Sequence, residues 1–120
     1  MATVFVIEDD ELIRECMLDM LSEQGFTTVG AANGRDALDQ IRAGLRPDLI
    51  LLDLMMPVMN GWDFRIEQVK EPDQQTVPVV IVTGSGEERR ALEQLSAAGT
   101  LRKPFTPSQL EEVVRRHIRS

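Results

Sequence analysis

The sequence predicts an α/β protein with three layers, in which a parallel five-stranded sheet lies between two layers of helices. The first observation is that short apolar runs alternate with segments of helical spacing, in the order β-α repeated five times. The second is that the runs at 49–52 and 79–82 are apolar on both faces, as strands are when helices cover both sides of a sheet. Right-handed crossovers then place the helices on both faces. A chain of 120 residues is enough for one domain, 1–120, and too short for two.

The first half of the chain begins with a β-rich run, Thr3–Ile7, which is the first predicted strand. A helix follows, with Gly25 as its stop signal. Its apolar residues at helical spacing are Leu12, Ile13, Cys16, Met17, Met20 and Leu21. A weaker strand then begins at Thr27.

Asn33 can cap the second helix, which ends before Gly44 and has Ala37, Leu38 and Ile41 on its inner face. The third strand is 48–53. It is apolar between its first residue, Asp48, and its last, Asp53. A short helix begins at Gly61.

The last four elements are the strand Val79–Val82, the helix from about Glu87 to Ala98 with Leu92 and Leu95 inward, the strand Thr100–Pro104, and a final helix. The final helix has Thr106 as N-cap, Pro107 at its first position and Gln109 completing a capping box. Its apolar stripe is Leu110, Val113, Val114, His117 and Ile118, and we assign His117 a packing or surface role.

Composition narrows the classes of function. A hydrophobic fraction of 42% argues against disorder, and a net charge of −7 argues against nucleic-acid binding through the overall field. No apolar run approaches a membrane span, and the N-terminus has no basic region typical of a signal peptide. The single cysteine, Cys16, excludes an internal disulfide, and we expect it to be a small buried hydrophobe. These points favour the cytoplasm.

Polar side chains follow four of the predicted strands. In a parallel sheet of this kind the functional crevice lies outside the carboxyl ends of the strands. Glu8 and Asp9 follow the first strand and Asp53 ends the third. Thr83 ends the fourth, before the small pair Gly84 and Ser85, and Lys103 ends the fifth, before Pro104. Three carboxylates, one hydroxyl and one ammonium are therefore expected at one edge.

This set of groups suits phosphoryl transfer. Neighbouring carboxylates repel unless a cation intervenes, and Mg²⁺ suits a site of carboxylates, a backbone carbonyl and water. The metal and Lys103 would neutralise a transferring phosphoryl group, and the Thr83 hydroxyl would donate to it. Asp53 would be the nucleophile, forming an acyl phosphate. The metal and the lysine would also compensate the cost of an aspartate at the end of an apolar strand.

Four segments in order resemble the receiver domain of bacterial two-component response regulators. They are VFVIEDDELIRE, PDLILLDLMMPVMNG, VPVVIVTG and LRKPF. The resemblance covers the whole chain and implies a flavodoxin-like (βα)5 sandwich with strand order 2-1-3-4-5. It also implies a phosphorylation-controlled signalling switch, not an enzyme, although such a domain promotes its own phosphorylation and dephosphorylation.

The resemblance assigns a role to each matching position. Asp53 corresponds to the phosphoacceptor, Lys103 to the phosphate partner and Thr83 to the switch hydroxyl. Asp9 corresponds to a direct Mg²⁺ ligand and Glu8 to an acid that holds the ion through water. Asp53 itself and the backbone carbonyl of Met55 would complete the metal site. The Lys103–Pro104 bond is expected to be cis, and Asp10 is expected to start the first helix. One position departs from the family: Thr100 stands where a tyrosine or phenylalanine is usual, so the resemblance does not carry over the coupling of the switch hydroxyl to an aromatic ring.

The partners implied by the resemblance are a histidine kinase or a histidine phosphotransfer protein, docking on the first helix near Leu12, Ile13 and Met17. Downstream lies a protein target or a missing output domain, because the chain ends at Ser120 with its last helix. A homodimer that forms through the fourth helix, the fifth strand and the fifth helix is also compatible with the resemblance. Direct nucleic-acid or membrane binding is not expected.

Three alternatives remain at this point. A degenerate receiver could act as a phosphorylation-independent interaction module, which the unusual Thr100 keeps open. A phosphatase of the haloacid dehalogenase type would need a second aspartate two residues after Asp53, where the chain has Met55. A nucleotide-binding domain would need a glycine-rich loop after the first strand, where acids stand instead.

Overall fold

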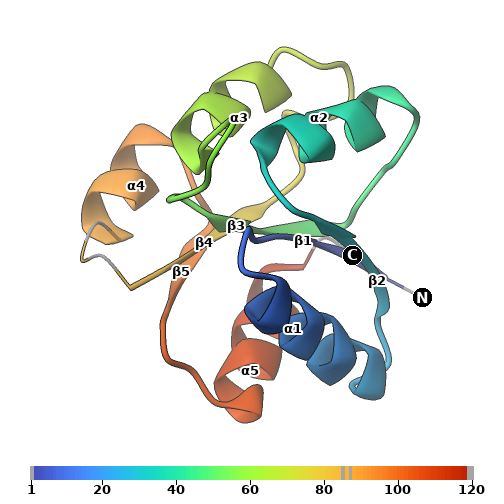
Figure 1. Cartoon of the computed structure of the whole chain (residues 1–120), viewed down its shortest axis with the longest axis vertical. Helices are drawn as coiled ribbons and strands as arrows, with labels where there is room; N and C mark the ends of the chain where they lie inside the picture. Colours follow the sequence, from blue (N-terminus) through green and yellow to red (C-terminus); the bar gives the residue numbers. More distant parts are fainter. Residues whose placement is uncertain (1, 85, 87, 119–120) are drawn as a thin grey trace.

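A computed structural model of the chain describes residues 2–84, 86 and 88–118 (Figure 1). Its sheet contains five parallel strands in the order β2-β1-β3-β4-β5, which confirms the predicted fold class and strand order. The strands are β1 (Thr3–Ile7), β2 (Thr27–Ala31), β3 (Leu49–Asp53), β4 (Val79–Thr83) and β5 (Gly99–Arg102). The helices are α1 (Glu11–Glu23), α2 (Gly34–Arg42), α3 (Gly61–Gln68), α4 (Glu88–Gln94) and α5 (Pro107–His117).

Helices cover both faces of the sheet. Figure 1 shows α1 and α5 on one face and α2, α3 and α4 on the other. On β3, Ile50 and Leu52 pack into the cluster under α2–α4, whereas Leu49 and Leu51 pack into the cluster under α1 and α5. This two-sided burial explains why the central strands are apolar along their length, and it leaves the strand ends as the places where polar groups collect.

The side chains predicted to start helices do so. Asp10 caps α1 by accepting a hydrogen bond from the backbone of its first turn at 3.0 Å. Asn33 caps α2 in the same way, and Thr106 forms a reciprocal capping box with Gln109 at the start of α5. Near the end of α5, the half-buried His117 packs directly on Gly99 of β5. The contact is so close that a Cβ at Gly99 would lie 2.5 Å from Nε2 of His117.

The prediction that Cys16 is buried is wrong, because its side chain is exposed. The face of α1 that packs on the sheet is narrower than the apolar stripe, and within the helix only Met17 and Leu21 are fully covered. Leu12, one turn before Cys16, is 72% exposed. The stripe therefore continues from the core onto the surface of the helix.

The region around α4 also differs from expectation. Leu95 is buried as predicted, but Leu92 is 38% exposed. The helix ends at Gln94 and not at Ala98, because Ser96 adopts a left-handed φ of 51° and the Ala98 N–H joins the sheet through the Val79 carbonyl at 2.8 Å.

Two boundaries near the carboxyl edge also move. The strand β5 ends at Arg102, so that Lys103 and Pro104 follow it, whereas β4 includes Thr83. Ser85 and Glu87, named in the sequence analysis, lie outside the described residues. None of the helices within the described ranges combines the length and apolarity needed to cross a bilayer.

Gly61 permits the close approach of α3 to the end of β3. A Cβ at this position would lie 2.5 Å from the carbonyl oxygen of Asp53 and 2.9 Å from Cα of Leu54. We expect Gly61→Ala to lower the free energy of unfolding by about 1–3 kcal/mol, measured by urea denaturation, because backbone must shift to admit the methyl group. Gly84→Ala is the control, since its nearest contact would be an ordinary 3.5 Å. Equal losses in the two variants would contradict the steric argument.

Candidate functional site

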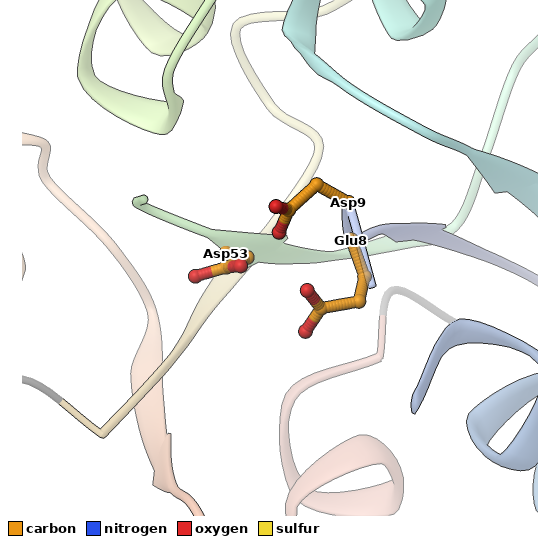
Figure 2. A group of neighbouring side chains, drawn as sticks. All are labelled: Glu8, Asp9 and Asp53. Atoms are coloured by element: carbon orange, nitrogen blue, oxygen red, sulfur yellow. The ribbon is translucent and has the colours of Figure 1, made fainter. Parts of the chain in front are cut away.

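Three carboxylates converge at the carboxyl edge of the sheet (Figure 2). Glu8 and Asp9 directly follow β1, and Asp53 is the last residue of β3. The two strands are neighbours, with Ile7 paired to Leu52, so the register brings the three side chains together. Each contributes one carboxylate oxygen to a group in which all of these atoms lie within 4.8 Å of one another.

Lys103 brings a positive charge to the same cluster. Its Nζ lies 2.5 Å from Oε1 of Glu8 and 3.7 Å from Oδ2 of Asp53. Burial by itself lowers the pKa of Lys103, but the hydrogen bond to Glu8 and the charges of Asp53, Glu8 and Asp9 outweigh burial and raise it. The ammonium is therefore held in its charged form beside the carboxylates.

Asp53 is the least favourably placed charge of the group. The residue is 6% exposed, and its Oδ1 accepts one hydrogen bond, from the Met55 N–H at 3.2 Å. Burial is the main cause that raises the pKa of Asp53 to about 7, followed by its interaction with Glu8, while Lys103 and the Met55 N–H act in the opposite direction. The cluster thus lacks positive charge at Asp53 in particular.

Glu8 and Asp9 differ in how firmly the protein holds them. Glu8 is buried, and its carboxylate accepts from Lys103 and from the Asp10 N–H at 3.2 Å. Asp9 is exposed at the mouth of the cluster. Three carboxylates that each offer an oxygen form the kind of ligand set that a hard divalent ion such as Mg²⁺ prefers, so the residues present fit the metal that the sequence predicts.

The remaining predicted residues surround this group. Thr83 ends β4, is 1% exposed, and its carbonyl accepts from the Lys103 N–H at 3.1 Å, so the two residues are neighbours. The Met55 side chain is 63% exposed, and its backbone faces Asp53. The Lys103–Pro104 peptide is cis, as predicted. Asp10 stays outside the carboxylate group, where it caps α1.

One contact was not foreseen from the sequence. The Arg14 guanidinium donates to the Glu8 carbonyl at 2.7 Å and so fixes the backbone between β1 and α1. Helical spacing places Arg14 one turn into α1, but nothing in the pattern distinguishes it from a solvated surface arginine. Only the path of the chain after β1 brings the carbonyl within its reach.

Comparison with known proteins identifies relatives of the chain. The family model for the response regulator receiver domain matches residues 4–115. The DNA-binding response regulator MtrA of Mycolicibacterium paratuberculosis is 36% identical over 118 residues, which cover 97% of this chain and 51% of MtrA. The chain therefore spans about half the length of this relative.

Two solved structures are similar over nearly the whole chain. The chemotaxis response regulator CheY4 of Vibrio cholerae has a TM-score of 0.89 and 30% identity, covering 97% of this chain and 98% of CheY4. The response regulator TrrA of Thermotoga maritima, solved in complex with Mg²⁺ and BeF, has a TM-score of 0.84 and 28% identity, with coverage of 97% and 98%.

The charge of Asp53 is expected to destabilise the metal-free fold at neutral pH. Its pKa in the folded protein, about 7, lies above the ordinary 3.8, so the folded state binds the proton more tightly than the unfolded chain. The stability that this proton contributes is fully present below pH 3.8, the ordinary pKa, and is lost as the pH rises through about 7, the pKa in the folded protein. With a chelator present, we expect Asp53→Asn to raise the free energy of unfolding by on the order of 1–3 kcal/mol at about pH 8, and by much less at about pH 4.

Urea denaturation at the two pH values measures this difference. Asp63→Asn, which removes an exposed acid from α3, is the matched control and should show no comparable gain. A destabilised Asp53→Asn variant at both pH values would show that the Asp53 charge is well compensated in the folded state.

Proposed function

The chain belongs to the family of response regulator receiver domains, and on that premise we propose that it is a phosphorylation-controlled switch in which Asp53 accepts a phosphoryl group. Receiver domains are signalling domains that interact with histidine kinases and with output domains. The donor here would be a phosphohistidine of a partner kinase or phosphotransfer protein, and the reaction would depend on Mg²⁺. The observation that supports this most directly is the meeting of Glu8, Asp9 and Asp53 with Lys103 at one edge of the sheet.

The acidic residues would bind the metal in two ways, directly and through water. Asp9 and Asp53 would bind Mg²⁺ directly with the Met55 carbonyl, and Glu8, already engaged by Lys103, would hold it through water. When bound, the ion supplies positive charge that offsets the carboxylates and the oxygens of the incoming phosphoryl group. The complex of TrrA with Mg²⁺ and BeF is consistent with this assignment, since TrrA is similar over almost the whole chain.

Asp53 performs the transfer. One of its carboxylate oxygens attacks phosphorus in line as the bond from phosphorus to the histidine nitrogen breaks. The product is an acyl phosphate, and the bonding electrons remain on the imidazole, which then takes up a proton from solvent. Lys103, 3.7 Å from Asp53 Oδ2, is close enough to transfer its contact from Glu8 to the new phosphoryl oxygens.

The phosphoryl group would then bias a conformational equilibrium. It adds between one and two negative charges and strong acceptor oxygens to the end of β3. Thr83, at the end of the neighbouring β4, would donate its hydroxyl to these oxygens and draw the following segment with it. The result is a shift between two populations, limited by the difference in phosphoryl contacts between them.

The partner that donates the phosphoryl group would dock on α1. Leu12 and Ile13 line an apolar groove of about 500 Å³ with Pro104 and Phe105, and this groove reaches Lys103. Met17, which the sequence analysis included in the docking surface, also lines this groove, although it is only 2% exposed and belongs mainly to the core. The exposed Cys16 takes part in the groove. A downstream protein, an output domain or a second copy would use the face formed by α4, β5 and α5.

Incubation with acetyl phosphate and Mg²⁺ should add one phosphoryl group to the chain. Intact-mass spectrometry should detect the adduct in the wild type and in Asp10→Asn, but neither in Asp53→Asn nor after chelation of the metal. The amide of asparagine cannot act as the nucleophile, while the other groups of the site remain in place. Labelling that persists in Asp53→Asn would assign the phosphoryl group to another residue.

Asp9 and Asp10 are adjacent acids with different expected roles. We expect Asp9→Asn to weaken Mg²⁺ binding at least about tenfold in calorimetric titrations. Mutation of residues that only support the ligands of a metal site already lowers affinity by about this factor, and Asp9 is a proposed ligand. Asp10→Asn keeps a helix-capping oxygen and should change the affinity by less than about threefold, since a charge outside the ligand set is screened. A larger loss of affinity in Asp10→Asn than in Asp9→Asn would contradict the assignment of Asp9 as the metal ligand.

A further inference from the structure

A second buried charge lies away from the carboxylate cluster. Arg65, on α3, is 7% exposed, and its hydrogen-bond partners among the described residues are carbonyl and amide oxygens, not carboxylates. Its Nε donates to the Leu95 carbonyl at 2.9 Å and its Nη2 to the Ser96 carbonyl at 3.5 Å, while its Nη1 donates to Oε1 of Gln68 at 2.7 Å. The buried guanidinium is therefore satisfied by the chain at the carboxyl end of α4.

These hydrogen bonds satisfy both the buried guanidinium of Arg65 and the carbonyl groups at the end of α4. The last carbonyls of a helix have no partner within it and carry the negative end of the helix dipole. The planar guanidinium, with five donors, can bond several of them at once. Gln68 in turn donates to the Gln74 carbonyl at 3.4 Å, which ties the arrangement to the segment before β4. The end of α4 is thus fixed to α3 by buried, charge-assisted hydrogen bonds.

The exposed part of α4 has a weaker contact with the same helix. The guanidinium of Arg90 lies over the ring of Trp62, 5.0 Å from its centroid. Trp62 is the only tryptophan of the chain and is half-buried in the first turn of α3. An exposed cation–π contact contributes far less than a buried set of charge-assisted hydrogen bonds, so of these two contacts between described residues the one made by Arg65 is the stronger.

We propose that Arg65 pins the carboxyl end of α4 to α3, so that switching swings the amino end of α4 across Trp62 instead of displacing the helix as a body. The swing rests on the proposed function, whereas the pin does not. Thr83, at the end of β4, lies on the side from which the chain enters α4, and so any pull from the phosphoryl group reaches the amino end of α4 before the end that Arg65 holds. In Figure 1, α3 and α4 lie next to each other on the same face of the sheet.

Amide hydrogen exchange tests the pin in the metal-free protein. The Leu95 and Ala97 amides donate to the Ala91 and Leu92 carbonyls at the end of α4. We expect Arg65→Met to speed their exchange at least about tenfold, because the end of the helix loses its buried partners. Arg89→Gln, which breaks only the exposed ion pair with Glu93 in the same helix, should change both rates by less than about twofold, because such exposed pairs contribute little. Unchanged rates in a folded Arg65→Met variant would overturn the pin.

Trp62 emission tests the swing, with beryllofluoride and Mg²⁺ as the phosphoryl mimic. Wild type and Arg89→Gln should show the same change in emission on adding the mimic. Arg90→Gln should retain less than about half of this change, because the moving cation is absent. In Arg65→Met the change should also fall, because the unpinned helix no longer turns about its end. If Arg65→Met does not fold, the comparison of Arg90→Gln with Arg89→Gln tests whether Arg90 moves relative to Trp62, and the exchange of the Leu95 and Ala97 amides in the wild type tests the pin: the mimic should leave these rates unchanged if the end of α4 stays fixed, and faster exchange would overturn the swing.

Fluorine NMR of the bound mimic separates the possible failures. Bound fluoride in all four proteins, with equal emission changes in Arg90→Gln and wild type, would overturn the swing and leave the proposed function standing. Absence of bound fluoride in the wild type would overturn the proposed function and the swing together.

Discussion

An excess of negative charge at the carboxyl edge of the sheet governs the rest of the structure. Glu8, Asp9 and Asp53 share a small volume with one ammonium, Lys103, whose closest contact is with Glu8 and not with Asp53. The fold tolerates Asp53 at a cost, visible in its raised pKa, and this cost is what a divalent ion and a phosphoryl group can exploit. Binding of a divalent ion would relieve repulsion that folding alone leaves in place.

The sheet makes this arrangement possible by placing separate segments in register. Parallel strands end at a common edge, so acids that follow β1 and β3 meet without any direct connection between them. Lys103 comes from beyond β5 and reaches across the end of β4, where its N–H donates to the Thr83 carbonyl. The lysine is therefore coupled by backbone to the same strand end that carries the hydroxyl, and a change in its ion pairing would be felt at both β4 and β5.

The surroundings of β5 and α4 suggest how a signal could leave the site in this chain. Thr100 on β5 provides only a small side chain, and it lines an open surface hollow of about 610 Å³ together with Arg102, Gln109 and Val113. The contacts between α3 and α4 are more specific, with Arg65 at one end and the Arg90–Trp62 contact further along the helix. A route through α4 thus has better-defined physical connections than one through a side chain of β5.

The sequence by itself determined the alternation of strands and helices, the helix caps at Asp10, Asn33 and Thr106, and the identity of the polar residues at the strand ends. These features depend on local chemistry and on periodicity, which a linear sequence contains. The tertiary structure decided which way the α1 stripe turns, leaving Cys16 exposed, and which carboxylate Lys103 contacts. It also decided that α4 ends early and that Arg65 is buried against it. Those outcomes depend on how far each helix rotates against the sheet and on distances between residues far apart in the chain, which no local pattern specifies.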